Sequence, residues 1–120
     1  MDDDPLLAAT GDVPYTAVIF SSVRLPAAAS PDYAEAARRM VELARAQPGY
    51  LGIESATSGG LGVTVSYWAG PEAARAWKEV GEHLAVQELG RDRWYADYRV
   101  RIATVDRDYG PTGRARSGGG

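Results

Sequence analysis

Apolar and polar positions follow two periods along the chain, the two-residue period of strands and the 3.6-residue period of helices. Residues 15–24 are rich in β-branched and aromatic side chains, with apolar residues on both faces, which predicts a central strand. Ser30 and Pro31 supply a hydroxyl cap and a proline at the first position of a helix. That helix must end by Gln47, because Pro48 disfavours helical geometry in the residue before it.

The second half of the chain repeats this change of period. Two strands are predicted at 50–56 and 61–68, separated by a Thr-Ser-Gly-Gly turn that is typical of a hairpin. Pro71 opens a second helix, Gly90 ends it, and a last strand follows at 98–106. The order βαββαβ predicts an α+β fold of the ferredoxin-like kind, with one antiparallel sheet and both helices on one face.

One face of the predicted sheet carries apolar residues that the two helices cannot cover. Ala17 and Ile19 lie on the face of the first strand opposite to Val18 and Phe20, and the last strand is apolar on both faces in the same way. Exposed apolar patches larger than a few hundred Å² usually mark an interface. We therefore expect a two-fold homodimer whose sheets pack face to face.

The composition excludes several kinds of site. The 120 residues include no cysteine and a single histidine, His83. A thiolate nucleophile, an Fe–S cluster, a disulfide and a multi-histidine metal centre within one chain are therefore excluded. We expect no metal and no other cofactor.

Charge and the two ends of the chain bear on partners and location. The formal net charge is −3, and the mixed signs leave no basic stripe for nucleic acid. The N-terminus is acidic where a secretory signal would be basic, and no apolar run reaches the length of a membrane span, so we expect a cytoplasmic protein without membrane contact. Residues 1–13 and the Gly/Arg/Ser tail 110–120 are expected to be disordered on either side of one domain, 14–109.

Six strings within this domain resemble the antibiotic biosynthesis monooxygenase family, whose members are small dimeric α+β barrels. They are Gln-Pro-Gly-Tyr-Leu-Gly-Ile-Glu at 47–54, Ser-Tyr-Trp at 66–68, Ala-Ala-Arg-Ala-Trp at 73–77, Glu-His at 82–83, Gly-Arg at 90–91 and Trp-Tyr-Ala-Asp-Tyr-Arg-Val-Arg at 94–101. The resemblance covers about residues 14–110. It implies a pocket between the sheet and the helices and, as in members from polyketide pathways, oxidation of an aromatic substrate by O₂ without metal or flavin.

A second branch of the same superfamily degrades haem. Its pattern has an asparagine on the first strand, a tryptophan in the second helix and a haem-ligating histidine ten residues later. Trp77 fits the tryptophan, but Gln87 stands at the ligand position and the first strand has no asparagine. Because glutamine is a very poor ligand of haem iron, haem degradation is disfavoured.

Polar and aromatic side chains in the two halves are the candidates for a site. His83 is the one side chain that titrates near neutrality, and it is either a general base or a partly exposed cap of a neighbouring carbonyl. Gln87 lies on the shoulder of the apolar arc of the second helix and binds either a substrate carbonyl or a backbone group. Expected to line the substrate pocket are Trp77, Tyr98, Trp68, Ser22 and Trp94, although some of these aromatics could instead lie at a dimer interface.

The function that these observations favour is a cofactor-independent monooxygenase that oxidises an aromatic or polyketide-like small molecule with O₂. His83 is the candidate base and Gln87 a candidate hydrogen-bonding partner of the substrate. Two alternatives remain open. The same pocket could serve a non-oxidative enzyme, such as a cyclase, isomerase or decarboxylase, or it could hold a ligand in a non-catalytic dimer.

Overall fold

Four strands and two helices follow one another in the predicted order. The computed structural model describes residues 6–26, 31–84 and 94–111, with residues 82–84 described by their backbone alone. The elements are β1 (Tyr15–Arg24), α1 (Pro31–Arg45), β2 (Tyr50–Ser58), β3 (Leu61–Trp68), α2 (Pro71–Leu84) and β4 (Tyr95–Val105). The last strand begins three residues earlier than the pattern predicts, because Tyr95 pairs with Arg24 beyond a bulge at the end of β1.

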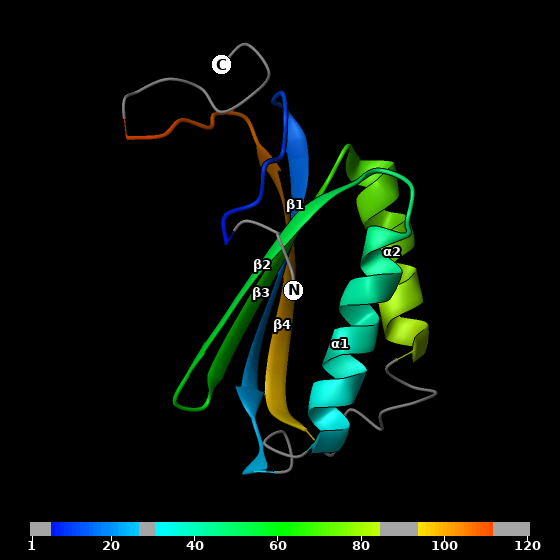
Figure 1. Ribbon diagram of the computed structural model, residues 1–120, viewed down its shortest axis with the longest axis vertical. Coiled ribbons are helices and arrows are strands. Elements are labelled where there is room, and N and C mark those ends of the chain that lie inside the picture. The colour runs from blue at the N-terminus through cyan, green and yellow to red at the C-terminus, as the bar shows by residue number, and fades with distance from the viewer. Residues whose placement is uncertain (1–5, 27–30, 85–93, 112–120) are drawn as a thin grey trace.

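The strands form one antiparallel sheet in the order β2-β3-β1-β4. At its centre, Val18 of β1 lies opposite Ser66 of β3 and Ile102 of β4. Both helices lie against the same face of this sheet (Figure 1), which we call the inner face. The predicted ferredoxin-like α+β fold is therefore confirmed.

The core lies between the inner face and the two helices. Its buried residues are Val18 from β1, Ala44 from α1, Trp68 from β3 and Ala74 from α2. Tyr50, Trp77 and Val100 pack against them while staying partly exposed. The small side chains of Ala44 and Ala74 let α1 and α2 pack closely on the end of the sheet where Trp68 lies. More space is left between the helices and the other end of the sheet.

The turn between α1 and β2 depends on a glycine for two reasons. Gly49 has a φ of 84°, a conformation that other residues rarely adopt. A Cβ at this position would also lie 2.7 Å from the Cβ of Ala73 on α2. The turn is fixed further by the backbone N–H of Ala69, which donates to the carbonyl of Gly49 at 2.8 Å.

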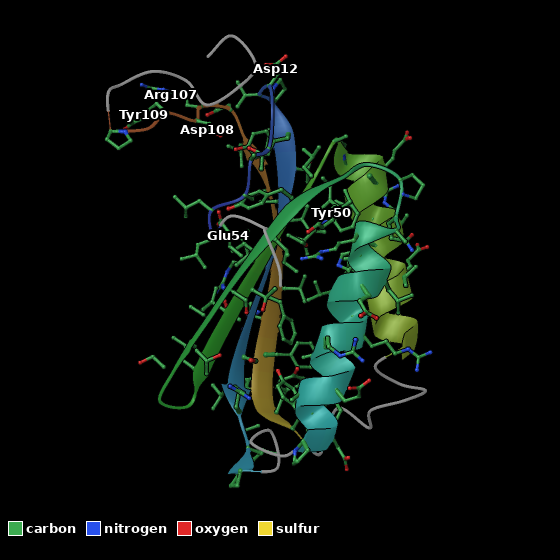
Figure 2. The ribbon with its side chains drawn as sticks, in the orientation of Figure 1. Asp12, Tyr50, Glu54, Arg107, Asp108 and Tyr109 are labelled. Atoms are coloured by element: carbon green, nitrogen blue, oxygen red, sulfur yellow. The ribbon has the colours of Figure 1, made fainter. Side chains whose placement is uncertain are left out.

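The opposite side of the sheet, the outer face, is partly covered by the chain before β1. In Figure 2, Glu54 of β2 and Asp108, which follows β4, lie on the side of the sheet away from the helices. The backbone N–H of Ala8 donates to Oε2 of Glu54 at 2.9 Å, and the hydroxyl of Thr10 donates to Asp108 at 3.3 Å. Residues 6–13, expected from the sequence to be disordered, thus contact the sheet in this structure, and Thr10 is buried.

On the outer face, β4 contributes the exposed side chains Asp97, Arg99 and Arg101, and beside them lies an open, largely apolar surface. It consists of alternate residues of β1 and β3, and Val23 and Leu61, which pair with each other, are 49% and 52% exposed. Ile19, Val63 and Val65 continue the same surface and are half-buried. Among the described residues, neither helix has the length and apolar character needed to cross a membrane.

Candidate functional site

A cavity of about 510 Å³ lies between the inner face of the sheet and the helices. A space of this size accommodates a small organic molecule. Its floor comes from the strands and its roof from α1 and α2. Every strand and both helices contribute lining residues. They are Val18, Phe20 and Arg24 of β1; Tyr33, Ala36, Ala37, Met40 and Val41 of α1; Ile53, Ser55 and Thr57 of β2; Thr64 and Ser66 of β3; Trp77, Lys78 and Gly81 of α2; and Trp94, Tyr95, Tyr98 and Val100 in and just before β4.

Two tyrosine hydroxyls meet at one end of this cavity. Tyr33 lies in the first turn of α1, Tyr95 begins β4, and the hydroxyl of Tyr95 donates to the hydroxyl of Tyr33 at 3.2 Å. Burial, helped by this hydrogen bond, raises the pKa of Tyr95 well above its ordinary value. Tyr95 therefore stays protonated at neutral pH and presents a phenol hydroxyl rather than a phenolate to the cavity.

Aromatic rings surround these hydroxyls. Phe20 packs edge-on against Tyr95, with ring centroids 5.4 Å apart, and its centroid is 5.6 Å from that of Tyr98. Trp94 packs edge-on against Tyr33 at 5.0 Å. Such contacts hold flat side chains in fixed orientations.

Arg24 adds a positive charge to the same end of the cavity. Its guanidinium carbon lies 4.7 Å from the centroid of the Tyr33 ring, in a cation–π contact. The charge of Arg24 lowers the pKa of Tyr95, against the larger effect of burial.

The two tryptophans at the other end form a layered wall. Trp77 of α2 lines the cavity and stacks on Trp68, with ring centroids 5.6 Å apart. Trp68 is fully buried, and its indole N–H donates to the hydroxyl of Ser66 at 2.9 Å. Trp68 therefore supports the wall from behind, whereas Trp77 and Ser66 face the cavity.

The residues predicted from the sequence fall into three groups. Trp77, Tyr98 and Trp94 line the cavity. Ser22 and Trp68 are buried on the inner face but are not among the residues that line it. The candidate catalytic residues fall outside the described side chains: His83 is described by its backbone alone, in the last turn of α2, and Gln87 lies in the segment 85–93, outside the described residues.

Sequence reasoning missed the polar end of the cavity. Tyr33 falls on the apolar face of the first helix, where nothing in a helical pattern separates a packing tyrosine from one whose hydroxyl lines a pocket. Arg24 ends a strand, where an arginine is ordinarily solvated. The polar end could have been found only by predicting the pairing of β1 with β4, which brings Arg24 opposite Tyr95.

Comparison with known proteins identifies the family. The family model described as antibiotic biosynthesis monooxygenase matches residues 14–89. The chain belongs to the antibiotic biosynthesis monooxygenase family. It is 49% identical over 102 residues to the uncharacterised protein YqjZ of Bacillus subtilis, an alignment covering 84% of this chain and 88% of the relative. The resemblance seen in the sequence is thereby confirmed.

Solved structures with the same fold include members of more than one function. A protein of unknown function from Nitrosomonas europaea, NE2512, superposes with a TM-score of 0.66 at 12% identity, covering 84% of this chain and 98% of the other. The haem-degrading protein MhuD of Mycobacterium tuberculosis superposes with a TM-score of 0.56 at 21% identity, covering 78% and 99%. At these identities the likeness shows the fold alone.

The described part of the chain holds no cluster of metal-ligating side chains. Within residues 6–26, 31–84 and 94–111, no group of three or more His, Cys, Asp or Glu residues lies close enough together to hold a metal ion. The polar groups of the cavity are instead tyrosine, serine and threonine hydroxyls and two basic side chains.

Proposed function

We propose that the protein is a cofactor-independent monooxygenase that oxidises an acidic aromatic or polyketide-like molecule with O₂ inside the cavity. The observation that carries this proposal is an apolar, aromatic-walled space of about 510 Å³ in which the Tyr33–Tyr95 hydroxyl pair forms a polar end. Membership in the antibiotic biosynthesis monooxygenase family supports the same reaction class.

The substrate supplies the reducing power in this reaction. For an anthrone, a base removes a proton from the methylene carbon, and the resulting enolate transfers one electron to O₂ to give superoxide and a substrate radical. These two combine into a peroxide at the former methylene carbon. Loss of water, which breaks the O–O bond and takes the remaining C–H proton, leaves the quinone. One anthrone and one O₂ thus yield one anthraquinone and one water.

The chain's residues have distinct tasks in this scheme. Trp77, Phe20 and Trp94 form a slot for a flat ring system and keep water from it. The hydroxyl of Tyr33, which accepts the hydrogen bond of Tyr95, donates its own proton to the oxygen on which negative charge develops. His83 remains the proposed base, and Gln87 the proposed partner of a substrate carbonyl. Neither assignment has support from the described side chains.

The assembly we propose is a homodimer through the outer face. The open apolar surface around Val23 and Leu61 supports it, because burying such a surface against its two-fold copy would remove both from water. The predicted homodimer stays a proposal, and this surface supports it.

Oxygen dependence separates this function from its alternatives. We expect an anthrone to be consumed in air and to be unchanged under nitrogen. Consumption without O₂ would indicate the cyclase, isomerase or decarboxylase alternative, and binding without turnover in either atmosphere would indicate a ligand-binding protein. Tight haem binding followed by verdohaem-like or biliverdin-like products would indicate haem degradation.

The assignment of His83 is tested separately. His83→Ala should lower kcat while leaving substrate binding nearly unchanged, because the base acts on a proton and not on affinity. His83→Gln is the matched variant, since its amide is of similar size but is no base at neutral pH. Unchanged turnover in both variants would remove His83 from the mechanism.

A further inference from the structure

The cavity is lined by basic side chains and not by acidic ones. Arg24 reaches it from the end of β1 and Lys78 from α2, and no Asp or Glu is among the described residues that line it. Most of the other lining side chains are apolar or aromatic. In surroundings of this kind, a charge is screened less than it is in water.

The backbone and stem of Arg24 are held by the hairpin between β2 and β3. Its backbone N–H donates to the carbonyl of Gly60 at 2.8 Å. A Cβ at Gly62 would lie 3.3 Å from Cδ of Arg24, so the side chain passes directly over this glycine. The guanidinium is then stacked on Tyr33 at 4.7 Å. Its position is thus defined by contacts along the whole side chain.

The neighbours of Arg24 complete a corner that suits a negatively charged oxygen. The guanidinium contributes a positive charge, and the hydroxyl of Tyr33, which accepts from that of Tyr95 at 3.2 Å, contributes a hydrogen-bond donor. Arginine presents several N–H donors in one plane, a geometry that matches phenolate and carboxylate oxygens. We call Arg24, Tyr33 and Tyr95 the oxyanion corner.

We propose that the cavity binds its aromatic ligand as an anion, with a phenolate, enolate or carboxylate oxygen seated in the oxyanion corner and the ring against Phe20 and Trp94. This rests on the proposed function only in taking the cavity as the substrate site. If the oxygen is that of the reacting enolate, Arg24 makes the substrate more acidic and so raises the fraction that can reduce O₂. Neutral aromatic molecules of the same shape should fit the cavity but bind less tightly than the anion.

The ionisation of a bound dye tests the proposal directly. The probe is 4-nitrophenol, which ionises near neutral pH and changes its absorption on doing so. Bound to the wild-type protein, the dye should ionise about one pH unit below free dye, which corresponds to about tenfold tighter binding of the phenolate. In Arg24→Met the pKa of bound dye should return to that of free dye or rise above it. Arg24→Lys keeps the charge and should retain part of the shift.

Arg75→Met is the matched control, because Arg75 is an exposed arginine of α2 that does not line the cavity. It should leave the shift unchanged. Circular dichroism of Arg24→Met checks that the fold is retained, and if that variant unfolds, Arg24→Lys and Lys78→Met carry the comparison. An unshifted dye in the wild type, or equal shifts in wild type and Arg24→Met, would overturn the proposal.

A second pair of probes identifies the kind of oxygen and separates this inference from the proposed function. Affinity for 2-naphthoate should exceed that for its neutral isostere 2-naphthamide by about tenfold if the corner accepts carboxylates. A dye shift without this difference assigns the corner to phenolates and enolates. Equal binding of ionised and neutral forms of both probes would overturn the proposal even if anthrone is oxidised. Conversely, a dye shift without oxidation of anthrone would support the proposed anion site and overturn only the proposed monooxygenase function.

Discussion

At the scale of single residues, the buried phenols do more than fill space. Tyr95 on the inner face and Tyr67 on the outer face both have a pKa raised above the ordinary value, chiefly because burial disfavours the charged form. Their hydrogen-bond partners differ. Tyr95 donates to another phenol, Tyr33, whereas Tyr67 donates to the carboxylate of Glu54 at 2.7 Å. The first arrangement leaves a neutral, hydrogen-bonding surface in the cavity, and the second holds the sheet together.

Removing one hydroxyl from the cavity tests its part in catalysis. Tyr33→Phe keeps the ring that packs against Trp94 and Arg24 but removes the hydroxyl. We expect kcat for anthrone oxidation to fall about a hundredfold, the size of effect seen when a donor to a developing oxyanion is lost, with a smaller change in KM. Tyr109→Phe is the control, since Tyr109 is 66% exposed. Equal kcat values in the two variants would contradict the assigned role.

The raised pKa values also predict how stability depends on alkaline pH. An unfolded tyrosine loses its proton near pH 10, the ordinary value, whereas Tyr67 and Tyr95 hold theirs to higher pH in the folded state. Because the folded state then binds more protons than the unfolded state, the free energy of unfolding should fall as the pH rises above about 10. Urea unfolding between about pH 8 and about pH 11 measures this, and Tyr67→Phe should show a shallower fall than wild type. If the free energy of unfolding fell equally steeply with pH in both proteins, the assigned role of Tyr67 would be contradicted.

At the scale of elements, the turn before β2 fixes where the helices meet the sheet. Gly49 brings the end of α1 within van der Waals distance of α2, where a Cβ would lie 2.7 Å from Ala73. The bulge at the end of β1 has a comparable effect at the other end, because it places Arg24 opposite Tyr95. The cavity lies between the turn at Gly49 and the bulge at the end of β1.

Two glycine substitutions separate backbone strain from the close contact. Gly49 and Gly59 both have positive φ, 84° and 60°, but only a Cβ at Gly49 would meet another atom within 4 Å. Gly59→Ala should therefore cost about 1 kcal/mol of unfolding free energy for strain alone, and Gly49→Ala about 2 kcal/mol or more. Chemical denaturation measures both. Equal costs would show that the turn does not press against α2.

The sequence predicts the elements better than it predicts the site. Period, caps and turn residues place all six elements, because each depends on neighbours within a few positions, as with Pro31 and Pro48. The polar end of the cavity depends on the pairing of β1 with β4 and on a helix packed above them. Tyr33 and Arg24 were missed for that reason, whereas the lining positions of Trp77, Trp94 and Tyr98 followed from aromatic density.

At the scale of the whole molecule, the two faces of the sheet have different uses. The inner face carries the core and the cavity, while the outer face keeps an open apolar surface beside the contacts of Ala8 and Thr10. Val23 and Ile102 are equally exposed, at 49%, but the strand register places them on opposite faces. This pair allows the proposed dimer face to be tested with a matched control.

Sedimentation of two charge variants tests the assembly. The wild type should sediment as a dimer, and Val23→Glu should shift it towards monomer, because the proposed interface would desolvate a second carboxylate opposite Asp97. Ile102→Glu introduces the same charge at the same exposure on the inner side and should remain dimeric. A monomeric wild type, or dissociation by Ile102→Glu and not by Val23→Glu, would contradict the proposed interface.

The stoichiometry of oxygen uptake tests the central claim most directly. Purified protein, treated with a chelator and free of added flavin or haem, is mixed with anthrone in an oxygen electrode while anthraquinone is quantified. The proposed reaction predicts uptake of one O₂ for each anthraquinone formed, at a rate that is proportional to protein concentration and unchanged by the chelator. No uptake above the protein-free rate, or uptake that requires added metal, flavin or haem, would contradict it.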